Sequence, residues 1–248
     1  MSLDDALAVA SLIDAARDDF LAGGESALED FHLAARAVLA GNPDGTEARR
    51  LLALPAGALL AALAGLWRER VNRLLRQAHG RLNLPPPAPV TADEARAFMR
   101  PAVTGLLSAG LLTARTASPL GQAGRAWDRQ YETGGAFTAL RGAMRGVTAG
   151  TLTTLTVASV VDTTRERGGD WVLGAYNPLD ERTAPLDREL VLNRGRAITT
   201  ARGRVVRSIP GQVGKYTPAN AWVPGPPRYG GDTHDGCRCV LIPERLSV

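Results

Sequence analysis

Four prolines stand within five positions of the chain, in the run Leu84-Pro85-Pro86-Pro87-Ala88-Pro89. Each proline removes a backbone N–H donor and restricts the preceding residue to extended geometry, so a regular helix cannot pass through the run. Such a run is typical of a stiff, extended connector. The sequence therefore predicts a connector at residues 85–90 that separates a segment at 1–84 from a segment at 91–167.

Upstream of this connector, apolar residues recur at the spacing of helices. Leu3, Leu7 and Ala10 begin one such run, and Gly23-Gly24 is predicted to end it. A second helix is predicted from Glu25 to Ala40 and a third from Pro55 to about Leu82. We therefore expect the first segment to be helical throughout.

Downstream, Thr91-Ala92-Asp93-Glu94 has the pattern of a capping box and predicts a helix that runs towards Ala117. Ser118-Pro119 predicts the start of a further helix that ends at Gly134-Gly135. The last helix is predicted from Ala136 to about Arg167. Its threonine-rich second half would also suit a strand.

The pattern changes at Gly168-Gly169, where glycine and proline become frequent between short apolar pieces. Residues 171–173, 204–206 and 240–242 have the length and composition of strands. The predicted fold class is α+β, with a mainly α-helical N-terminal body followed by a small β-containing C-terminal module at residues 168–248.

Charge is unevenly distributed along the chain, although the net charge is only +4. Residues 1–35 hold eight acids against Arg17, and residues 188–215 hold seven bases against Glu189. The basic stretch is a candidate for contact with DNA or with a partner, or it is an ordinary solvated surface. The residues proposed to lie near DNA are Arg194, Arg196, Arg202, Arg204 and Arg207.

Three long stretches carry no charge: residues 51–67, 101–114 and 146–161. Each is shorter than the roughly 20 residues that a membrane-spanning helix needs. The acidic N-terminus also lacks the basic start of a secretory signal. We therefore expect these stretches to be buried helices of a bundle, without stable membrane association.

Both cysteines and one of the three histidines fall within His234-Asp235-Gly236-Cys237-Arg238-Cys239. In an extended chain, Cys237 and Cys239 point to the same face. Zinc prefers thiolate and imidazole ligands, usually four in a structural site, so one ligand must come from elsewhere. The candidates for it are Asp187, Asp232, Asp235 and His79. Alternatively, the cysteines are small buried strand residues and His234 is a loop donor.

A second constellation is the charged turn from Asp180 to Asp187. Asp180 and Thr183 lie near a proline and are suited to side-chain hydrogen bonds that stabilise a turn. The planar guanidinium of Arg182 can hold Asp180 or Asp187. Four charges in eight residues usually form a solvated loop, and the sequence contains no phosphate loop, nucleophile elbow or dinucleotide fingerprint. The turn is therefore weak evidence for an enzyme.

In this order the pieces resemble the minor head proteins of tailed phages related to the F protein of phage Mu. In that family a helix leads through a strand into a D-E-R-T-C-P-x-C turn, and H-P-x-C-R-C with an apolar strand closes the domain. Here Asp180-Glu181-Arg182-Thr183-Ala184-Pro185 matches the turn. The closing motif and its strand are matched by His234-Asp235-Gly236-Cys237-Arg238-Cys239-Val240-Leu241. The resemblance covers about residues 136–243.

The chain departs from the family at the two cysteines of the turn, where it has Ala184 and Asp187. A metal site built from four cysteines and the histidine is therefore excluded. Asp187 is an oxygen ligand, which suits zinc less well than sulfur. The favoured interpretation is a hydrogen-bonded clasp in which Arg182 and His234 tie the turn to the closing strand. The other motif residues assigned to this clasp are Asp180, Thr183, Asp187, Cys237, Arg238 and Cys239.

The resemblance implies a low-copy structural protein of the phage head, located in the virion and in the host cytoplasm during assembly. Its implied partners are the portal protein, the major capsid or scaffold protein, and packaged DNA bound without sequence selectivity. It would not be an enzyme, and zinc is the one cofactor that the motifs suggest. The alternative is a hydrolytic enzyme or toxin-like effector carried on such a domain, with His79 or His32 in its site. A zinc-dependent nucleic-acid module ranks below the structural role, because only Arg228, Tyr229 and Arg238 flank the cluster.

Overall fold

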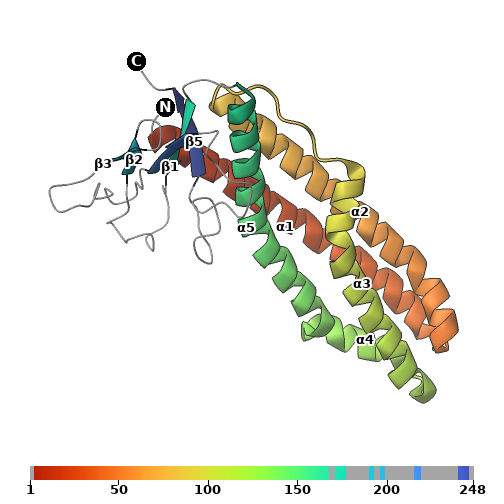
Figure 1. The fold of residues 1–248 in the computed structure, drawn as a ribbon. Coiled ribbons are helices and arrows are strands. Elements are labelled where there is room, and N and C mark those ends of the chain that lie inside the picture. Colours follow the sequence, from red (N-terminus) through yellow and green to blue (C-terminus); the bar gives the residue numbers. More distant parts are fainter. Residues whose placement is uncertain are drawn as a thin grey trace. The chain divides into compact units, whose positions relative to one another are not determined.

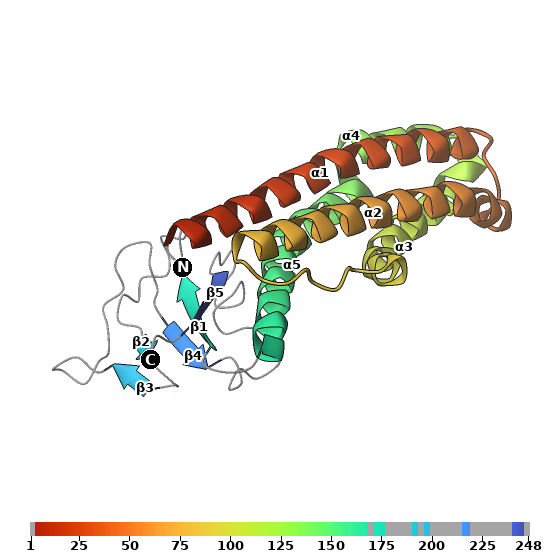
Figure 2. The same cartoon turned by 90° about the horizontal axis from the view of Figure 1, so that it is seen from above.

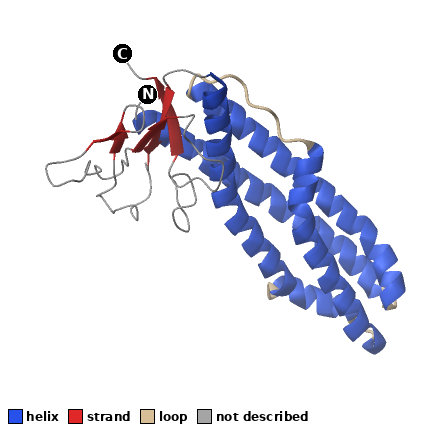
Figure 3. Cartoon of the chain, viewed as in Figure 1, coloured by secondary structure: helices blue, strands red, loops and turns tan. Residues whose placement is uncertain are grey.

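The computed structural model describes residues 3–167 and, after them, residues 171–176, 190–192, 196–198, 215–218 and 240–245. Helices make up nearly all of the first part (Figures 1 and 3). The mainly α-helical body predicted for residues 1–167 is therefore confirmed. Its elements are α1 (Leu3–Ala40), α2 (Gly45–Arg81), α3 (Ala92–Ala117), the 3-10 turn η1 (Ser118–Leu120), α4 (Ala123–Glu132) and α5 (Gly135–Arg167).

Helix α1 is continuous through Gly23-Gly24, where the sequence predicted a helix end. A Cβ added to Gly23 would lie 3.1 Å from the side chain of Leu66 on α2. A Cβ on Gly24 would collide with the side chain of Met144 on α5. The two glycines therefore mark close helix packing rather than a turn, and the predicted break is wrong.

Helix α2 begins ten residues before Pro55, the predicted start. Asp44 caps it, because its Oδ1 accepts hydrogen bonds from the backbone N–H groups of Thr46 and Glu47 at 2.8 Å each. Pro55 lies inside the helix and removes one backbone donor there. Burial of Leu52 and Leu59 on either side of it offsets that loss.

The capping box of α3 is present as predicted. The backbone N–H of Thr91 donates to Glu94 Oε2 at 2.8 Å, and the backbone N–H of Glu94 donates to Thr91 Oγ1 at 3.2 Å.

The predicted helix start at Ser118 is wrong, because Ser118 opens only η1. Gly121 then adopts a left-handed φ of 63°, so the next helix, α4, begins at Ala123. The predicted end at Gly134-Gly135 is confirmed, since α4 ends at Glu132 and α5 begins at Gly135.

Helix α5 extends to Arg167 through the threonine-rich segment that also suited a strand. The hydroxyl of Thr156 donates to the carbonyl of Leu152 at 2.8 Å, and that of Thr164 donates to the carbonyl of Val160 at 2.6 Å. Both threonines are buried, so these bonds within the helix satisfy groups that would otherwise lack a partner. The helical alternative is therefore the correct one.

The uncharged stretch of α2 is buried on one side, which includes Leu52, Leu59 and Leu63, and exposed on the other. In α2 the side chain of Leu54 is 81% exposed, and Ala58, Ala61 and Gly65 are exposed as well. Helix α2 and the segment Ala92–Leu120 are long and apolar enough to cross a membrane by length and composition alone, and a third of each apolar window is buried. The uncharged stretch of α2 is therefore a helix with one buried and one exposed face, and the absence of stable membrane association stays a prediction.

The described residues divide into two compact units. Unit 1 takes its described residues from 3–17, 72–88 and 148–245, and unit 2 comprises residues 18–71 and 89–147. The division falls within α1, α2 and α5 and between residues 88 and 89 of the connector, which has no helix or strand at 84–90. The division of the chain into domains at 1–84, 85–90, 91–167 and 168–248 stays a prediction.

Strands occur in unit 1 after α5 (Figure 2). β1 (Trp171–Tyr176) pairs in antiparallel fashion with β4 (Lys215–Pro218) and with β5 (Val240–Arg245). β2 (Leu190–Leu192) pairs with β3 (Arg196–Ile198). Two predicted strands fall within β1 and β5, and the third, at 204–206, lies outside the described residues.

Aromatic side chains form the centre of unit 2. The ring of Trp67 on α2 meets Phe20 edge-on at 5.3 Å and stacks on Phe98 at 4.7 Å. Trp127 of α4 packs edge-on against Phe137 at 5.1 Å. A Cβ on Gly110 of α3 would lie 3.2 Å from the side chain of Leu52 on α2. This close approach places the end of α3 beside the start of α2.

Candidate functional site

Nearly all site residues predicted from the sequence lie outside the described residues. Arg196 is the first residue of β3. The clasp, the zinc site and the DNA-proximal arginines therefore stay predictions. The predicted site residues that lie outside the described residues are Asp180, Arg182, Thr183, Asp187, Arg194, Arg202, Arg204, Arg207, His234, Cys237, Arg238 and Cys239. Among the described residues, no group of three or more His, Cys, Asp or Glu side chains is placed to hold a metal ion.

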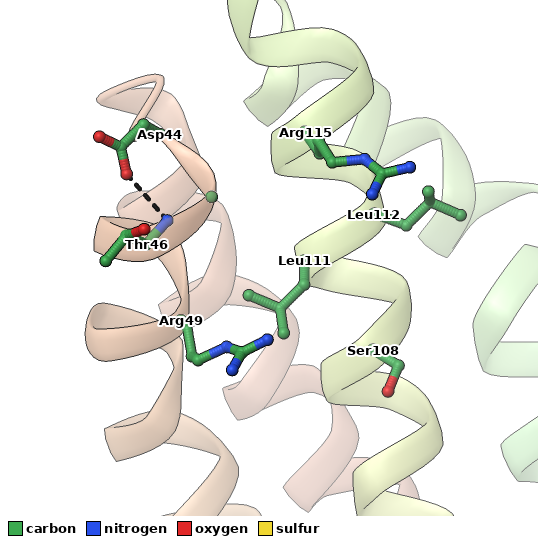
Figure 4. A pocket seen from close by; sticks show the side chains of 8 residues that line it. Asp44, Thr46, Arg49, Ser108, Leu111, Leu112 and Arg115 are labelled. Atoms are coloured by element: carbon green, nitrogen blue, oxygen red, sulfur yellow. Dashed lines mark hydrogen bonds between the residues drawn. The ribbon is translucent and has the colours of Figure 1, made fainter.

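A groove of about 810 Å³ lies in unit 2 between the start of α2 and the end of α3 (Figure 4). The loops beside it are joined, because Ser118 Oγ donates to the carbonyl of Pro43 at 2.9 Å. The backbone N–H of Ala123 also donates to Asn42 Oδ1 at 3.4 Å. The groove is lined by Asp44, Gly45, Thr46, Arg49, Ser108, Leu111, Leu112 and Arg115.

Two exposed arginines give this groove its charge. Arg49 and Leu111 project from facing helices into the space between α2 and α3, whereas Arg115 and Leu112 extend on the side of α3 away from α2 (Figure 4). Within the described part of the chain, neither guanidinium takes part in an ion pair. Asp44 also lines the groove, but one of its carboxylate oxygens caps α2. The groove is therefore basic, with apolar side chains between the charges.

A second polar cluster in unit 2 surrounds His32 of α1. Its ring stacks on that of Tyr131 with the centroids 3.9 Å apart, and its Nε2 lies 3.4 Å from Asp128 Oδ1. Arg36 Nε donates to Asp128 Oδ2 at 2.8 Å. Burial lowers the pKa of His32, and the charge of Asp128 partly offsets this. His32 Nδ1 is buried and has no hydrogen-bond partner among the described residues.

Arg141 of α5 also contacts the ring of Tyr131. Its guanidinium lies 5.3 Å from the centroid of the Tyr131 ring. Its Nε also donates to both carboxylate oxygens of Glu25, at 3.1 and 2.9 Å. These contacts join α1, α4 and α5, so we interpret the cluster as packing rather than as a site of chemistry.

In unit 1, His79 connects α2, the connector and α5. Its Nδ1 lies 2.6 Å from the carbonyl oxygen of Pro85, and its Nε2 lies 2.7 Å from Ser159 Oγ. Because a carbonyl oxygen can only accept a hydrogen bond, Nδ1 carries the proton of the neutral ring. Nε2 then accepts a hydrogen bond from the hydroxyl of Ser159. Burial lowers the pKa of His79, and the bond to Pro85 partly offsets this.

The hydroxyl of Ser159 thus lies against one ring nitrogen of His79, while a carbonyl acceptor fixes the other ring nitrogen. Pairs of a nucleophile and a general base in enzymes have the same arrangement. The sequence had singled out His79 but not Ser159, which lies 80 positions further along the chain. No local pattern predicts a contact over such a separation.

No protein-family model matches this chain, and no curated protein or solved structure matches it. The resemblance to the head proteins related to phage Mu F therefore depends on the sequence motifs. The described structure contributes the helical body, the groove and the two buried histidines.

Proposed function

We propose that this chain is a structural minor head protein of a tailed phage or prophage, present in few copies at the portal or capsid interior. The order of the motifs carries the proposal. A helix that ends at Arg167 and a strand that begins at Trp171 stand before the Asp180–Pro185 turn. The strand that begins at Val240 follows directly on His234–Cys239.

On this proposal, residues 168–248 form the small β-containing module of that family, with the clasp between Arg182 and His234. The helical body docks to the portal, capsid or scaffold protein, and the protein assists assembly, packaging or delivery of the genome. Any contact of the basic 188–215 stretch with packaged DNA is through phosphates and weakens steeply with salt. The protein is then located in the virion, and in the host cytoplasm during assembly.

Quantitative mass spectrometry of purified, DNA-filled particles tests this role. The expected result is a few copies of the chain per portal ring. Precursor particles from the same lysate provide the comparison, because an assembly factor that leaves before packaging is present only there. Absence from both kinds of particle would contradict the structural role.

The hydrogen bond between Ser159 and His79 favours a second candidate, a hydrolytic enzyme. In such an enzyme His79 Nε2 would take the proton of Ser159 Oγ as the serine attacks a carbonyl or phosphoryl centre. A fluorophosphonate probe would then label the wild-type chain and not a Ser159→Ala variant. An unlabelled wild-type chain would remove this candidate.

A further inference from the structure

We infer that the groove between α2 and α3 binds an extended, acidic segment of a partner protein that also carries apolar side chains. This inference rests on the proposed structural role, because it gives the helical body a docking site for another head protein. The groove lies within unit 2 and includes none of the residues that carry the resemblance to phage Mu F.

Charge is the first argument. Arg49 and Arg115 are exposed and make no ion pair with any described residue, and both line the groove. Of the lining residues only Asp44 is acidic, and its Oδ1 already accepts two backbone hydrogen bonds. Guanidinium groups match carboxylates in geometry and bind them through paired hydrogen bonds. The groove therefore complements a partner with at least two acidic groups.

The leucines are the second argument. Leu112 is 56% exposed, and Leu111 and Leu112 line the groove together with the two arginines. Removing such side chains from water favours binding only if the ligand has apolar groups of its own. A nucleic-acid backbone would use the arginines and leave Leu112 in water. A peptide with both acidic and apolar side chains uses all four residues.

The placement of these side chains is the third argument. Arg49 and Leu111 lie between the helices, whereas Arg115 and Leu112 extend on the far side of α3 (Figure 4). Because the two guanidinium groups project from different helices and in different directions, an extended chain with acidic side chains at separate points can pair with each of them. A volume of about 810 Å³ accommodates several residues of such a chain.

The test uses the full-length chain and a fluorescein-labelled peptide of alternating glutamate and leucine, with binding measured by fluorescence anisotropy. The double variant Arg49→Glu/Arg115→Glu is expected to bind about tenfold or more weakly, because attraction becomes repulsion. Leu112→Ser is expected to weaken binding about threefold. Arg96→Glu is the matched control, because Arg96 lies on the same helix, is also exposed and pairs with Asp93 at 3.6 Å.

Circular dichroism of each variant establishes that the helices have formed. Peptides of glutamate with serine, and of lysine with leucine, are expected to bind at least about tenfold more weakly than the parent peptide. Failure of the glutamate–leucine peptide to bind, or equal binding by the double variant, would overturn the inference. So would duplex DNA that binds at Arg49 and Arg115 while the peptide does not, which would assign the groove to nucleic acid.

Particle analysis separates this inference from the proposed function. If the double variant enters particles as well as wild type and the peptide does not bind, the groove assignment is wrong and the structural role stands. If the peptide binds at the groove but the chain is absent from all particles, the structural role is wrong and the groove assignment stands.

Discussion

The two buried histidines, one in each unit, show how differently the same side chain is used. His79 is 1% exposed and His32 is 8% exposed, and burial lowers the pKa of both. Both ring nitrogens of His79 are hydrogen-bonded, so its ring joins three segments. His32 instead has aromatic neighbours, one distant carboxylate and a buried Nδ1 without a partner among the described residues. The two histidines are both buried, so what distinguishes them is their partners: His79 has hydrogen-bond partners on both ring nitrogens, and His32 is packed mainly against aromatic rings.

Replacing each histidine by phenylalanine gives the largest expected difference. His79→Phe leaves Ser159 Oγ and the carbonyl of Pro85 without their partner, and we expect it to lower the free energy of unfolding by about 3 kcal/mol. His32→Phe retains a ring against Tyr131 and removes the buried Nδ1, so its expected cost is below about 1 kcal/mol. Urea denaturation measures both. Equal costs would show that the contrast between the two sites is wrong.

Ser159→Ala isolates one of the two bonds of His79. The variant leaves Nε2 buried without a donor, and we expect the free energy of unfolding to fall by about 1–2 kcal/mol. Ser108→Ala is the matched control, because Ser108 donates only to the carbonyl of Thr104 in its own helix. Equal stability of the Ser159 variant and the wild type would mean that the bond to Nε2 contributes nothing net.

Tyr131→Leu tests the aromatic environment of His32. It removes the stack on His32 and the contact with Arg141 while it keeps an apolar side chain. We expect a loss of about 1 kcal/mol in the free energy of unfolding. Combining it with His32→Leu, which removes the imidazole ring, in a double-mutant cycle measures the coupling of the two rings. A coupling energy of zero would contradict the role of stacking at this site.

The smallest effect is on the pH dependence of stability. Both histidines resist protonation in the folded chain, whereas the unfolded chain takes up protons near the ordinary histidine pKa of about 6.5. Their contribution to stability is therefore complete above about pH 6.5 and is lost as the pH falls towards the lowered pKa values. Thermal unfolding from about pH 7.5 to about pH 5 is expected to depend less on pH in either Phe variant than in wild type. An unchanged slope in both variants would contradict the lowered pKa values.

The features that the sequence predicted correctly are local ones. Thr91 and Glu94 lie three positions apart, and their side chains and backbone make up the whole capping box. Gly23-Gly24 resembled a helix end in the same local sense, but the Leu66 side chain that packs there comes from another helix. Without knowledge of that neighbour, a glycine pair cannot be assigned to packing rather than to a turn.

The same limit applies to the candidate sites. The groove joins Arg49 to Arg115 across two helices, and Ser159 meets His79 across 80 positions. Neither pair has a spacing that a motif could encode. The cysteine and histidine cluster at 234–239 was conspicuous because it is contiguous, and it lies outside the described residues.

The bond from His79 to Pro85 also determines where the chain tolerates added length. Pro85 is held through its carbonyl, Leu84 donates its N–H to the carbonyl of His79 at 2.8 Å, and Arg167 donates to the carbonyl of Asn83 at 2.8 Å. An affinity tag or fluorescent label inserted between Leu84 and Pro85 would separate the carbonyl of Pro85 from the ring of His79. Inserted between Ala88 and Pro89, it would leave all three bonds in place, and this peptide bond is where we would attach a reporter.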